Sequence, residues 1–239
     1  MILAAAEFGK FFPMLMTAAG TVKAARAMVL GAGVAGLQAI ATARRLGAIV
    51  SATDVRPAAK EEIRSLGASY VGVDDAESAA QTGAYAREMS DAFRAKQAEL
   101  MATTVAKNDI VICTALVMGR RAPVIVTEAM VAAMKAGSVV VDLAAEAGGN
   151  CAATVPGQAT VTANGVKVLG YTNWPGRIAV AASSLYARNL LTFLTMFWNK
   201  NDGRHVLPED DDIVKGVLLT RGNAVVHPGF QPAPQQAPA

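Results

Sequence analysis

Cysteine and histidine are scarce in this chain of 239 residues, and their scarcity excludes several kinds of site. Two cysteines, Cys113 and Cys151, are too few for a disulfide framework and lack metal-ligand spacing, which fits a reducing compartment. Cys113 lies in an apolar run and is predicted to be a small core residue. The two histidines, His205 and His227, lie in the polar C-terminal region. The sequence shows no Ser/His/Asp set, Cys/His pair or metal-ligand cluster, so hydrolysis and metal catalysis are unsupported.

A strong net charge and long uninterrupted apolar runs are also missing. The formal net charge is +3 and the basic residues are dispersed, so no nucleic-acid partner is expected. Three glycines and Gln38 interrupt the uncharged stretch 27–43, whereas a spanning helix needs about 20 mostly apolar residues. The N-terminal stretch has no basic region, and Glu7 and Lys10 break it, so it is not a signal peptide by pattern. We therefore expect no direct membrane insertion.

Short apolar runs alternate with helical patterns along most of the chain, which is typical of an α/β protein. Hydrophobic residues make up 53% of the sequence, which excludes general disorder and allows a real core. The near-continuous apolar strands fit burial on both faces of a sheet. The sequence therefore predicts a doubly wound parallel sheet, with strands over 27–30, 49–52, 69–73, 109–113 and 139–142 and helices over 37–46, 60–66, 91–105 and 127–134.

The segments outside this alternation are predicted separately. A helix rich in apolar residues is expected over 2–16, with Pro13 as a kink or a boundary. Asn164-Gly165, between apolar alternations, predicts a hairpin or tight turn. The C-terminal part is expected to contain a long helix over 179–197, an acidic turn over 209–212, a small hairpin around 221–223 and a flexible tail over 228–239.

The most specific pattern lies between Arg26 and Asp54. An apolar run leads into the glycine turn 31–36, a helical stretch follows, and a second apolar run ends at Asp54. This is the order of a dinucleotide-binding fingerprint. Gly31 permits the tight turn, Gly33 lets the backbone approach a pyrophosphate, and Gly36 lets the helix pack on the strand. The helix start directs its N–H groups at the phosphate. The context favours a Rossmann-like nucleotide site over a glycine-rich turn that binds nothing.

Asp54 and Arg56 bear on which nucleotide is bound. Asp54 would accept hydrogen bonds from the adenosine ribose hydroxyls, and its charge would repel the extra phosphate of NADP. Arg56 weakens this preference, because an arginine nearby can serve a 2′-phosphate. The alternative for Arg56 is a solvated residue before Pro57. The pattern therefore favours NAD(H) and leaves the role of Arg56 open.

With these segments placed, the sequence resembles a known family, the NAD(H)-binding domain of the alpha subunit of proton-translocating NAD(P)+ transhydrogenase. The resemblance covers nearly the whole chain, and its joint motifs are more specific than the glycine turn alone. The segments that carry it are 12–22, 31–48, 52–56, 83–89, 113–116, 142–150 and 226–228.

The resemblance implies a hydride transfer between NADH and NADP+ that is coupled to proton translocation across a membrane. It implies that this domain holds NAD(H), that an NADP-binding domain and a membrane domain are its partners, and that it forms a homodimer. It also implies a cytoplasmic location, peripheral on the inner membrane through the partner subunits. Hydride passes directly between two nicotinamides in this reaction, so no catalytic side chain is required.

The resemblance and the fingerprint together give a set of expected cofactor-binding residues. Tyr85 matches the tyrosine of a mobile loop that closes over the nucleotide, although on pattern alone it is a surface aromatic. Gln97 lies in a polar helix and would otherwise be taken as solvated. The full set is Gly31, Ala32, Gly33, Val34, Gly36, Asp54, Val55, Arg56, Gly83, Ala84, Tyr85, Gln97, Thr114, Ala115 and Leu116.

One departure from the family concerns the N-terminus. Family members carry an N-terminal subdomain before the segment that begins here, and its polar loop arranges the nicotinamide end. We therefore expect an N-terminally truncated domain that is inactive alone, with apolar side chains such as Leu15, Leu191, Phe193 and Phe197 exposed. The expected organisation is a linking helix over 1–19, an NAD-binding domain over 20–172, a second linking helix with a remnant of the second subdomain over 173–227 and a tail over 228–239.

Two other functions remain open. Alanine dehydrogenase is a fold relative, and Glu146 lies where that family places an acid near the substrate. Amino-acid oxidation also needs a general base or a carboxylate-binding cation, and that family's catalytic Lys and His lie in the N-terminal segment that is missing here. Glu146 is otherwise a loop carboxylate that caps backbone N–H groups. The chain could also bind nucleotide as a fragment and turn nothing over.

Overall fold

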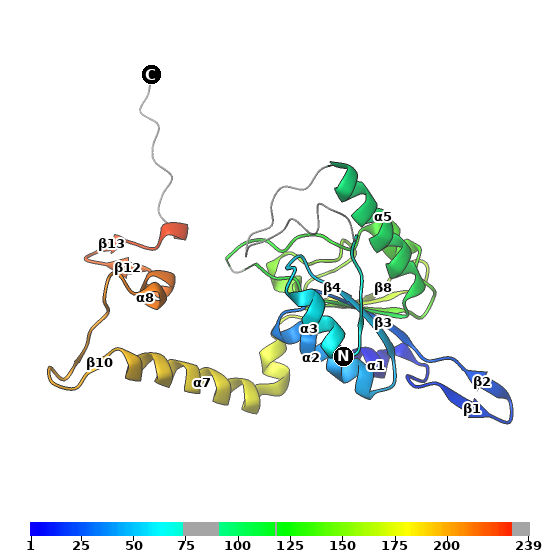
Figure 1. Cartoon of the computed structure of the whole chain (residues 1–239), viewed down its shortest axis with the longest axis horizontal. Coiled ribbons are helices and arrows are strands. Elements are labelled where there is room, and N and C mark those ends of the chain that lie inside the picture. The colour runs from blue at the N-terminus through cyan, green and yellow to red at the C-terminus, as the bar shows by residue number, and fades with distance from the viewer. Residues whose placement is uncertain (74–90, 118, 231–239) are drawn as a thin grey trace, which may run out of the picture. The chain divides into compact units, whose positions relative to one another are not determined.

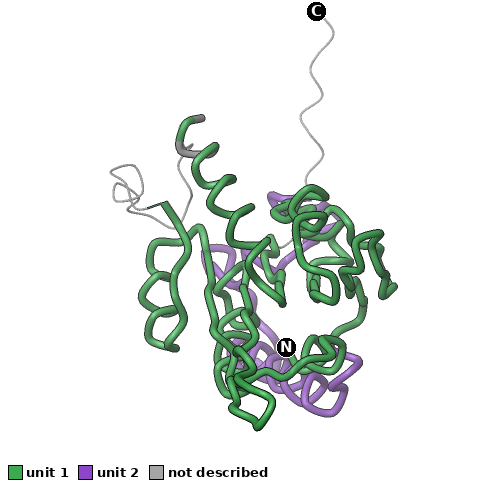
Figure 2. Tube along the Cα trace, turned by 90° about the vertical axis from the view of Figure 1, so that its right-hand side faces the viewer, with its two compact units in different colours: residues 1–174 green, residues 175–239 purple. Residues whose placement is uncertain are grey.

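The computed structural model of the chain describes residues 1–73, 91–117 and 119–230 (Figure 1). The chain separates into two compact units, Met1–Trp174 and Pro175–Ala239, which Figure 2 colours green and purple. The first unit contains the alternating strands and helices, and the second contains the long C-terminal helix. Each unit is described by itself below.

A seven-stranded sheet forms the centre of the first unit, in the order β5-β4-β3-β6-β7-β9-β8. All neighbouring strands are parallel except β8 and β9, which are antiparallel. The Rossmann-like α/β fold predicted from the sequence is therefore confirmed, with a sheet that is mostly rather than wholly parallel. The strands are β3 (Arg26–Leu30), β4 (Ile49–Thr53), β5 (Ser69–Tyr70), β6 (Ile110–Cys113), β7 (Val139–Asp142), β8 (Ala159–Val161) and β9 (Lys167–Leu169).

Both faces of the sheet are covered by helices, because the strands are apolar on both sides. Alternate residues of a strand point to opposite faces. Ala27 and Val29 of β3 join one core, whereas Met28 and Leu30 join the other. The first core receives α1 (Ile2–Phe8), α2 (Val34–Arg45) and α3 (Ala59–Ser65), and the second receives α5 (Asp91–Lys107) and α6 (Glu128–Ala132).

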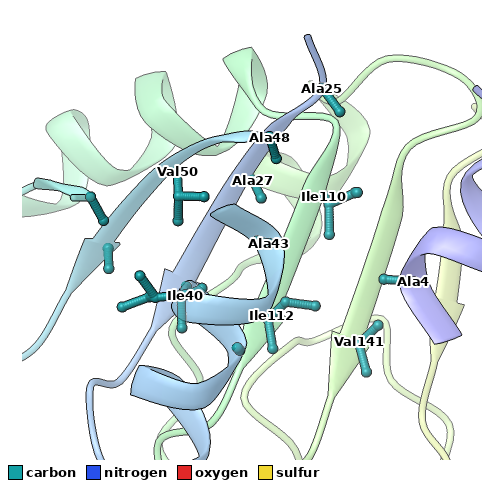
Figure 3. Packing of buried hydrophobic residues seen from close by; sticks show 14 of the residues in the cluster. Ala4, Ala25, Ala27, Ile40, Ala43, Ala48, Val50, Ile110, Ile112 and Val141 are labelled. Carbon is teal, nitrogen blue, oxygen red and sulfur yellow. The ribbon is translucent and has the colours of Figure 1, made fainter. Parts of the chain in front are cut away.

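Figure 3 shows the first of these cores at close range. Ile40 and Ala43 of α2 lie over the sheet beside Ile112, and Ala4 of α1 lies beside Val141 of β7. All of these side chains are fully buried or nearly so. Burial of this kind, worth about 25 cal/mol per Å² of apolar surface, fixes α2 and the turn that precedes it against β3 and β4.

The N-terminal segment is not the predicted helix over 2–16. Helix α1 ends after seven residues at Gly9, whose φ of +68° is the left-handed conformation that commonly ends a helix. Pro13, which cannot continue a helix, packs against Gly47. The chain then forms an antiparallel hairpin of β1 (Leu15–Thr17) and β2 (Gly20–Val22). Apolar composition alone does not separate one long helix from a short helix followed by a strand.

Helix α1 belongs to the core of the first unit and is not a free linker. Phe8 is buried and its ring meets the ring of Phe12 edge-on, with the centroids 5.9 Å apart. Lys167 of β9 donates from Nζ to the carbonyl oxygen of Glu7 at 2.7 Å and to its carboxylate at 3.0 Å. These contacts tie α1 to the far strands of the sheet.

The hairpin predicted at Asn164-Gly165 is confirmed, since β8 and β9 flank this turn and Gly165 has a φ of +80°. The third strand is shorter than the predicted 69–73, because β5 covers only Ser69–Tyr70. The small hairpin predicted around 221–223 is present in the second unit, but its turn has two residues and not three. Its strands are β12 (Thr220–Arg221) and β13 (Ala224–Val225), which flank Gly222-Asn223.

A 3-10 turn, Trp174–Ile178, joins the two units along the chain, and the predicted long helix, α7 (Ala179–Met196), follows in the second unit. The acidic segment 209–212 is a helix start and not a turn, because Asp211 accepts from the N–H groups of Ile213 and Val214 and so caps α8. The remaining elements are the pair β10 (Trp198–Asn199) and β11 (Arg204–His205), which was not predicted, α8 (Asp212–Val217) and the 3-10 turn Pro228–Phe230.

Helix α7 carries many apolar side chains and none of its residues is buried. Leu191 is 64% exposed, as expected from the sequence. Phe197 is buried, contrary to expectation, and its ring centroid lies 5.0 Å from that of Phe193. Among the described residues, one helical stretch, Trp174–Met196, is long and apolar enough to cross a membrane by length and composition alone.

Candidate dinucleotide site

The order of strands reverses between β3 and β6. From β3 the chain builds β4 and β5 on one side, and it then crosses to β6 on the other side. In open α/β sheets, ligands bind beyond the carboxyl ends of the strands at such a reversal. The glycine turn 31–33 follows β3 and the segment 114–116 follows β6. The Thr114 N–H donates to the Leu30 carbonyl at 2.8 Å, so two predicted segments of the site meet there.

Two of the three fingerprint glycines are required by the fold itself. Gly31 has a φ of +96°, and a Cβ at this position would lie 2.8 Å from the Thr114 hydroxyl oxygen. A Cβ at Gly36 would lie 1.9 Å from the Gly31 carbonyl oxygen. Any side chain at Gly36 would therefore push α2 away from the turn. These contacts explain the first and third glycines without reference to a ligand.

Gly33 is different, because neither its backbone nor its surroundings require a glycine. Its φ is −70°, and within the described residues a Cβ there would meet nothing within 4 Å. Gly33 is also the N-cap of α2, and no side chain in the described structure caps the first turn of this helix. Within the described residues, the N–H groups of that turn have no side-chain acceptor, and they present the positive end of the helix dipole. This arrangement suits an anion that approaches the backbone closely.

Asp54 follows β4 and lies directly beside the glycine turn. Its Oδ2 accepts from the Ala32 N–H at 2.7 Å, and its Oδ1 accepts from the Arg56 N–H at 2.8 Å. The Arg56 Nε donates to Oδ1 at 3.1 Å, and its Nη2 donates to the Ala32 carbonyl at 3.1 Å. The interpretation of Arg56 as a merely solvated residue is therefore wrong.

Asp54 is held in its charged form by these contacts. Burial raises the pKa of the Asp54 carboxyl, but the hydrogen bonds from the Ala32 and Arg56 N–H groups and the charge of Arg56 lower it further than burial raises it. The net effect is a pKa below the ordinary value of the carboxyl group. At neutral pH the site therefore carries a fixed negative charge next to the N-terminus of α2.

The segment after β6 is held in place by hydrogen bonds that sequence reasoning missed. The Thr114 hydroxyl lies 2.9 Å from the Gly31 carbonyl, to which it donates. The fully buried Asn150 accepts from the Ala115 N–H at 3.1 Å and donates to the Ala115 carbonyl at 2.9 Å. Thr114 and Ala115 are therefore fixed by the protein itself, and their direct contact with a nucleotide remains a prediction.

Asn150 is itself oriented by Asp142 at the end of β7, which is also fully buried. The Oδ2 of Asp142 accepts from the Asn150 N–H at 2.8 Å, from the Cys151 N–H at 3.0 Å and from the Thr154 hydroxyl at 2.7 Å. The sequence signal for this network is an aspartate at the end of a buried strand, where a carboxylate needs several donors to be buried.

The other predicted site residues lie around this centre. Val34, Val55 and Leu116 are 91%, 77% and 49% exposed, so apolar side chains border the open space beside the glycine turn. Gln97 is half-buried, and its Oε1 accepts from the Val73 N–H at 3.2 Å, so it is not simply solvated. Gly83, Ala84 and Tyr85, with the proposed lid, lie outside the described residues.

An open cavity of about 480 Å³ lies on the same edge of the sheet and is bordered by the segments after β6 and β7. One side of this cavity is formed by Glu146, whose carboxylate accepts from the Asn173 N–H at 2.5 Å. The interpretation of Glu146 as a capping carboxylate is thereby confirmed. The lining residues are Leu116, Val117, Gly119, Arg120, Arg121, Glu146 and Ala147.

The side chains of the two cysteines belong to the second core, which α5 and α6 cover. Both are buried, as predicted for Cys113. Burial, followed by the nearby charge of Asp142, raises the pKa of the Cys113 thiol well above its ordinary value, and burial likewise raises the pKa of Cys151. Protonated, buried thiols are poor nucleophiles, so they serve as core side chains.

Comparison with known proteins places this geometry in a family. Residues 1–228 match the family described as "Alanine dehydrogenase/PNT, C-terminal domain". The chain belongs to this family. An NAD(P) transhydrogenase alpha subunit from Rhodospirillum rubrum is 53% identical over 94% of this chain. The similarity to the transhydrogenase alpha subunit inferred from the sequence is therefore confirmed.

Solved structures separate the two branches of the family. The crystal structure of transhydrogenase from Sinorhizobium meliloti matches 94% of this chain with a TM-score of 0.79 and 52% identity. An L-alanine dehydrogenase structure matches 87% of the chain with a TM-score of 0.67 and 27% identity. The transhydrogenase is thus more similar in both sequence and structure. The chain spans 59% of the length of the R. rubrum and S. meliloti proteins and 52% of the alanine dehydrogenase.

Proposed function

We propose that this chain binds NAD(H) at the switch point between β3 and β6 and is the NAD(H)-binding component of a proton-translocating transhydrogenase. The observation that carries the proposal is the position of Asp54, whose carboxylate lies 2.7 Å from the Ala32 N–H of the glycine turn. That position puts the ribose acceptor and the phosphate-binding turn side by side, as a dinucleotide requires. The 53% identity to a transhydrogenase alpha subunit supports the choice of reaction.

The residues at the site fit a dinucleotide along its whole length. The open space at Gly33 and the first turn of α2 suit the pyrophosphate, and Asp54 suits the adenosine ribose. The exposed side chain of Val55, next to Asp54, suits the flat adenine ring, which gains from apolar cover. The 480 Å³ cavity between the β6 and β7 segments suits the nicotinamide end.

When bound, the nicotinamide supplies the hydride or receives it. The protein holds the ring in place and excludes water. No side chain has to move a proton, and Glu146 is already engaged with the Asn173 N–H. Hydride transfer requires two reacting carbons about 3–3.5 Å apart, so a second nicotinamide must reach this edge of the sheet. The chain has one glycine fingerprint, and we therefore assign the second nicotinamide to an NADP-binding partner domain.

In this proposal residues 20–172 form the NAD-binding domain, and residues 173–227 form a linking helix with a return segment. A membrane domain carries the protons, and the chain is peripheral on the cytoplasmic face through its partners. The exposed apolar side chains of α7, such as Leu191, are then covered within the assembly. The division between Trp174 and Pro175 supports the C-terminal boundary of this domain, whereas α1, before residue 20, packs in the core of the same compact unit.

The reaction itself is tested by mixing this chain with an NADP-binding transhydrogenase domain. We expect negligible reduction of an NAD analogue by NADPH when this chain is alone, because one site cannot hold two nicotinamides. Turnover is expected to appear when the NADP-binding domain and the other parts of the transhydrogenase, including its membrane domain, are present. L-alanine oxidation is measured in parallel. Turnover of L-alanine by the chain would contradict the transhydrogenase assignment and favour the alanine dehydrogenase alternative.

We further propose that the chain forms a homodimer through the β1–β2 hairpin. An isolated two-stranded hairpin is marginally stable in water. Here Met16 of the hairpin is 80% exposed, and Phe11 and Met14, just before the hairpin, are 62% and 63% exposed. A second copy would cover these side chains and pair with the hairpin, which would stabilise both.

Replacing Met16 by aspartate is expected to raise the dimer dissociation constant by about tenfold or more, since burial of one methionine is worth roughly 1.5–3 kcal/mol. Sedimentation velocity over a range of concentrations measures this change. Val161→Asp is the matched control, because Val161 is a similarly exposed residue of β8, 67% exposed, outside the hairpin. Equal effects of the two substitutions would show that the hairpin is not the interface.

A further inference from the structure

The Arg56 side chain closes over the carboxylate to which the proposed function assigns the ribose. Asp54 retains only 9% of its side-chain exposure, whereas the Arg56 side chain retains 47%. The guanidinium reaches across Asp54 with Nε at 3.1 Å from Oδ1, and its Nη2 continues to the Ala32 carbonyl at 3.1 Å. The side chain thus spans from the ribose acceptor to the backbone of the glycine turn.

The acceptor positions of Asp54 are largely taken in this arrangement. A carboxylate offers about four lone-pair positions. The Ala32 N–H and the Arg56 N–H take two of them, and both are backbone groups fixed by the turn. The Arg56 guanidinium takes a third at Oδ1 and lies 3.4 Å from Oδ2. Two ribose hydroxyls can bond this carboxylate only if the guanidinium leaves.

A second carboxylate, that of Glu62, lies near the Arg56 guanidinium. Its Nη2 lies 3.9 Å from the Oε2 of Glu62, which is in the first turn of α3 and is half-exposed. A rotation away from Asp54 would exchange one carboxylate for another. The charge of Arg56 would then remain next to the ribose without covering it. Because the Arg56 and Glu62 side chains are both about half-exposed, the guanidinium can pass from one carboxylate to the other while it stays in contact with solvent.

We propose that Arg56 is a second specificity-determining residue of this site, which occupies the ribose face of Asp54 in the empty protein and is exchanged for the ribose hydroxyls when a nucleotide binds. The inference rests on the proposed NAD(H) site. The exchange lowers the affinity for a nucleotide with free ribose hydroxyls. The released guanidinium would remain near the ribose and attract a 2′-phosphate, so we expect the same residue to raise the affinity for NADPH relative to NADH.

The test compares ADP with 2′,3′-dideoxy-ADP, which has no hydroxyl groups to compete with Arg56. Both are titrated calorimetrically into the wild type and into Arg56→Gln, which keeps the backbone N–H but removes the guanidinium. The loss of phosphate attraction is common to both ligands and cancels in their ratio. We expect the ratio of ADP affinity to dideoxy-ADP affinity to rise about two- to fivefold in Arg56→Gln. NADPH affinity relative to NADH is expected to fall.

Two further variants sharpen the result. Arg56→Lys keeps the charge but cannot bridge Asp54 and the Ala32 carbonyl, so its affinity ratio should lie between the other two. Arg64→Gln, at an exposed arginine in the last turn of α3, is the control and should leave the ratio unchanged. An unchanged or lower ratio in Arg56→Gln would contradict the exchange while leaving the nucleotide site intact. Absence of ADP and NADH binding by the wild type would contradict both the site and the exchange.

Discussion

Gly33→Ser is expected to weaken NADH binding by at least about tenfold without lowering the stability of the fold. Gly33 has a φ of −70° and open space around a Cβ, so a serine fits the backbone. Serine is a favoured N-cap, and its hydroxyl would accept from the first-turn N–H groups of α2. Those are the groups that the pyrophosphate needs. The serine would therefore cap α2, and the same hydrogen bonds would make its first-turn N–H groups unavailable to the pyrophosphate.

Gly36→Ser is the matched comparison, and it is expected to lower the stability of the fold. Its Cβ would lie 1.9 Å from the Gly31 carbonyl oxygen, so α2 or the turn must shift. Overpacking of this kind costs about 1–3 kcal/mol of unfolding free energy. Chemical denaturation and NADH titration of both variants separate the two roles. If Gly33→Ser binds NADH as the wild type does, the pyrophosphate does not lie at this turn.

Asn150→Ala is expected to have the largest effect on stability, with a loss of about 2–5 kcal/mol in the free energy of unfolding. The substitution leaves the Ala115 N–H and carbonyl and the Pro123 carbonyl without their side-chain partner, and it opens a cavity in a fully buried place. Because Ala115 borders the switch point, NADH affinity should fall as well. Both effects follow from one anchoring side chain.

Asn189→Ala is the control for this prediction, because Asn189 is exposed on α7. Its effect on the free energy of unfolding should stay within about 0.5 kcal/mol. Urea denaturation of the three proteins provides the comparison. An Asn150→Ala variant as stable as the Asn189→Ala variant would show that the buried network does not hold the 114–116 segment.

The centre of the fold was predictable because its signals are local. The β3–turn–α2–β4 unit is specified by an apolar strand, three glycines and an apolar helix face within 29 residues, Arg26 to Asp54. Two of those glycines are explained by packing that the fingerprint pattern itself anticipates. The N-terminal helix was overextended, since its apolar composition hid the left-handed Gly9 that ends it. The start of α8 was missed because four acidic residues appeared to be a solvated turn, although Asp211 is a cap.

The site was predictable only on the side of the glycine turn. Asp54 was identified from its spacing, but its ion pair with Arg56 was not, since two neighbouring charges can equally point into solvent. The bonds between Asn150 and Ala115 join residues 35 positions apart, and a single sequence contains no signal for such a pairing. Sequence pattern thus locates the residues on the surface of the candidate site and misses the buried groups that position them.

We propose that this chain binds NAD(H) through Asp54 beside the glycine turn. The most direct test of this binding is a calorimetric titration of NADH and of NADPH into the wild type and into Asp54→Ala. We expect one saturable site in the wild type that binds NADH more tightly than NADPH. Asp54→Ala should lower NADH affinity by about ten- to a hundredfold, because a charge-assisted ribose contact is worth about 1.5–3 kcal/mol. Equal wild-type affinities for NADH and NADPH, or an unchanged NADH affinity in Asp54→Ala, would contradict the account.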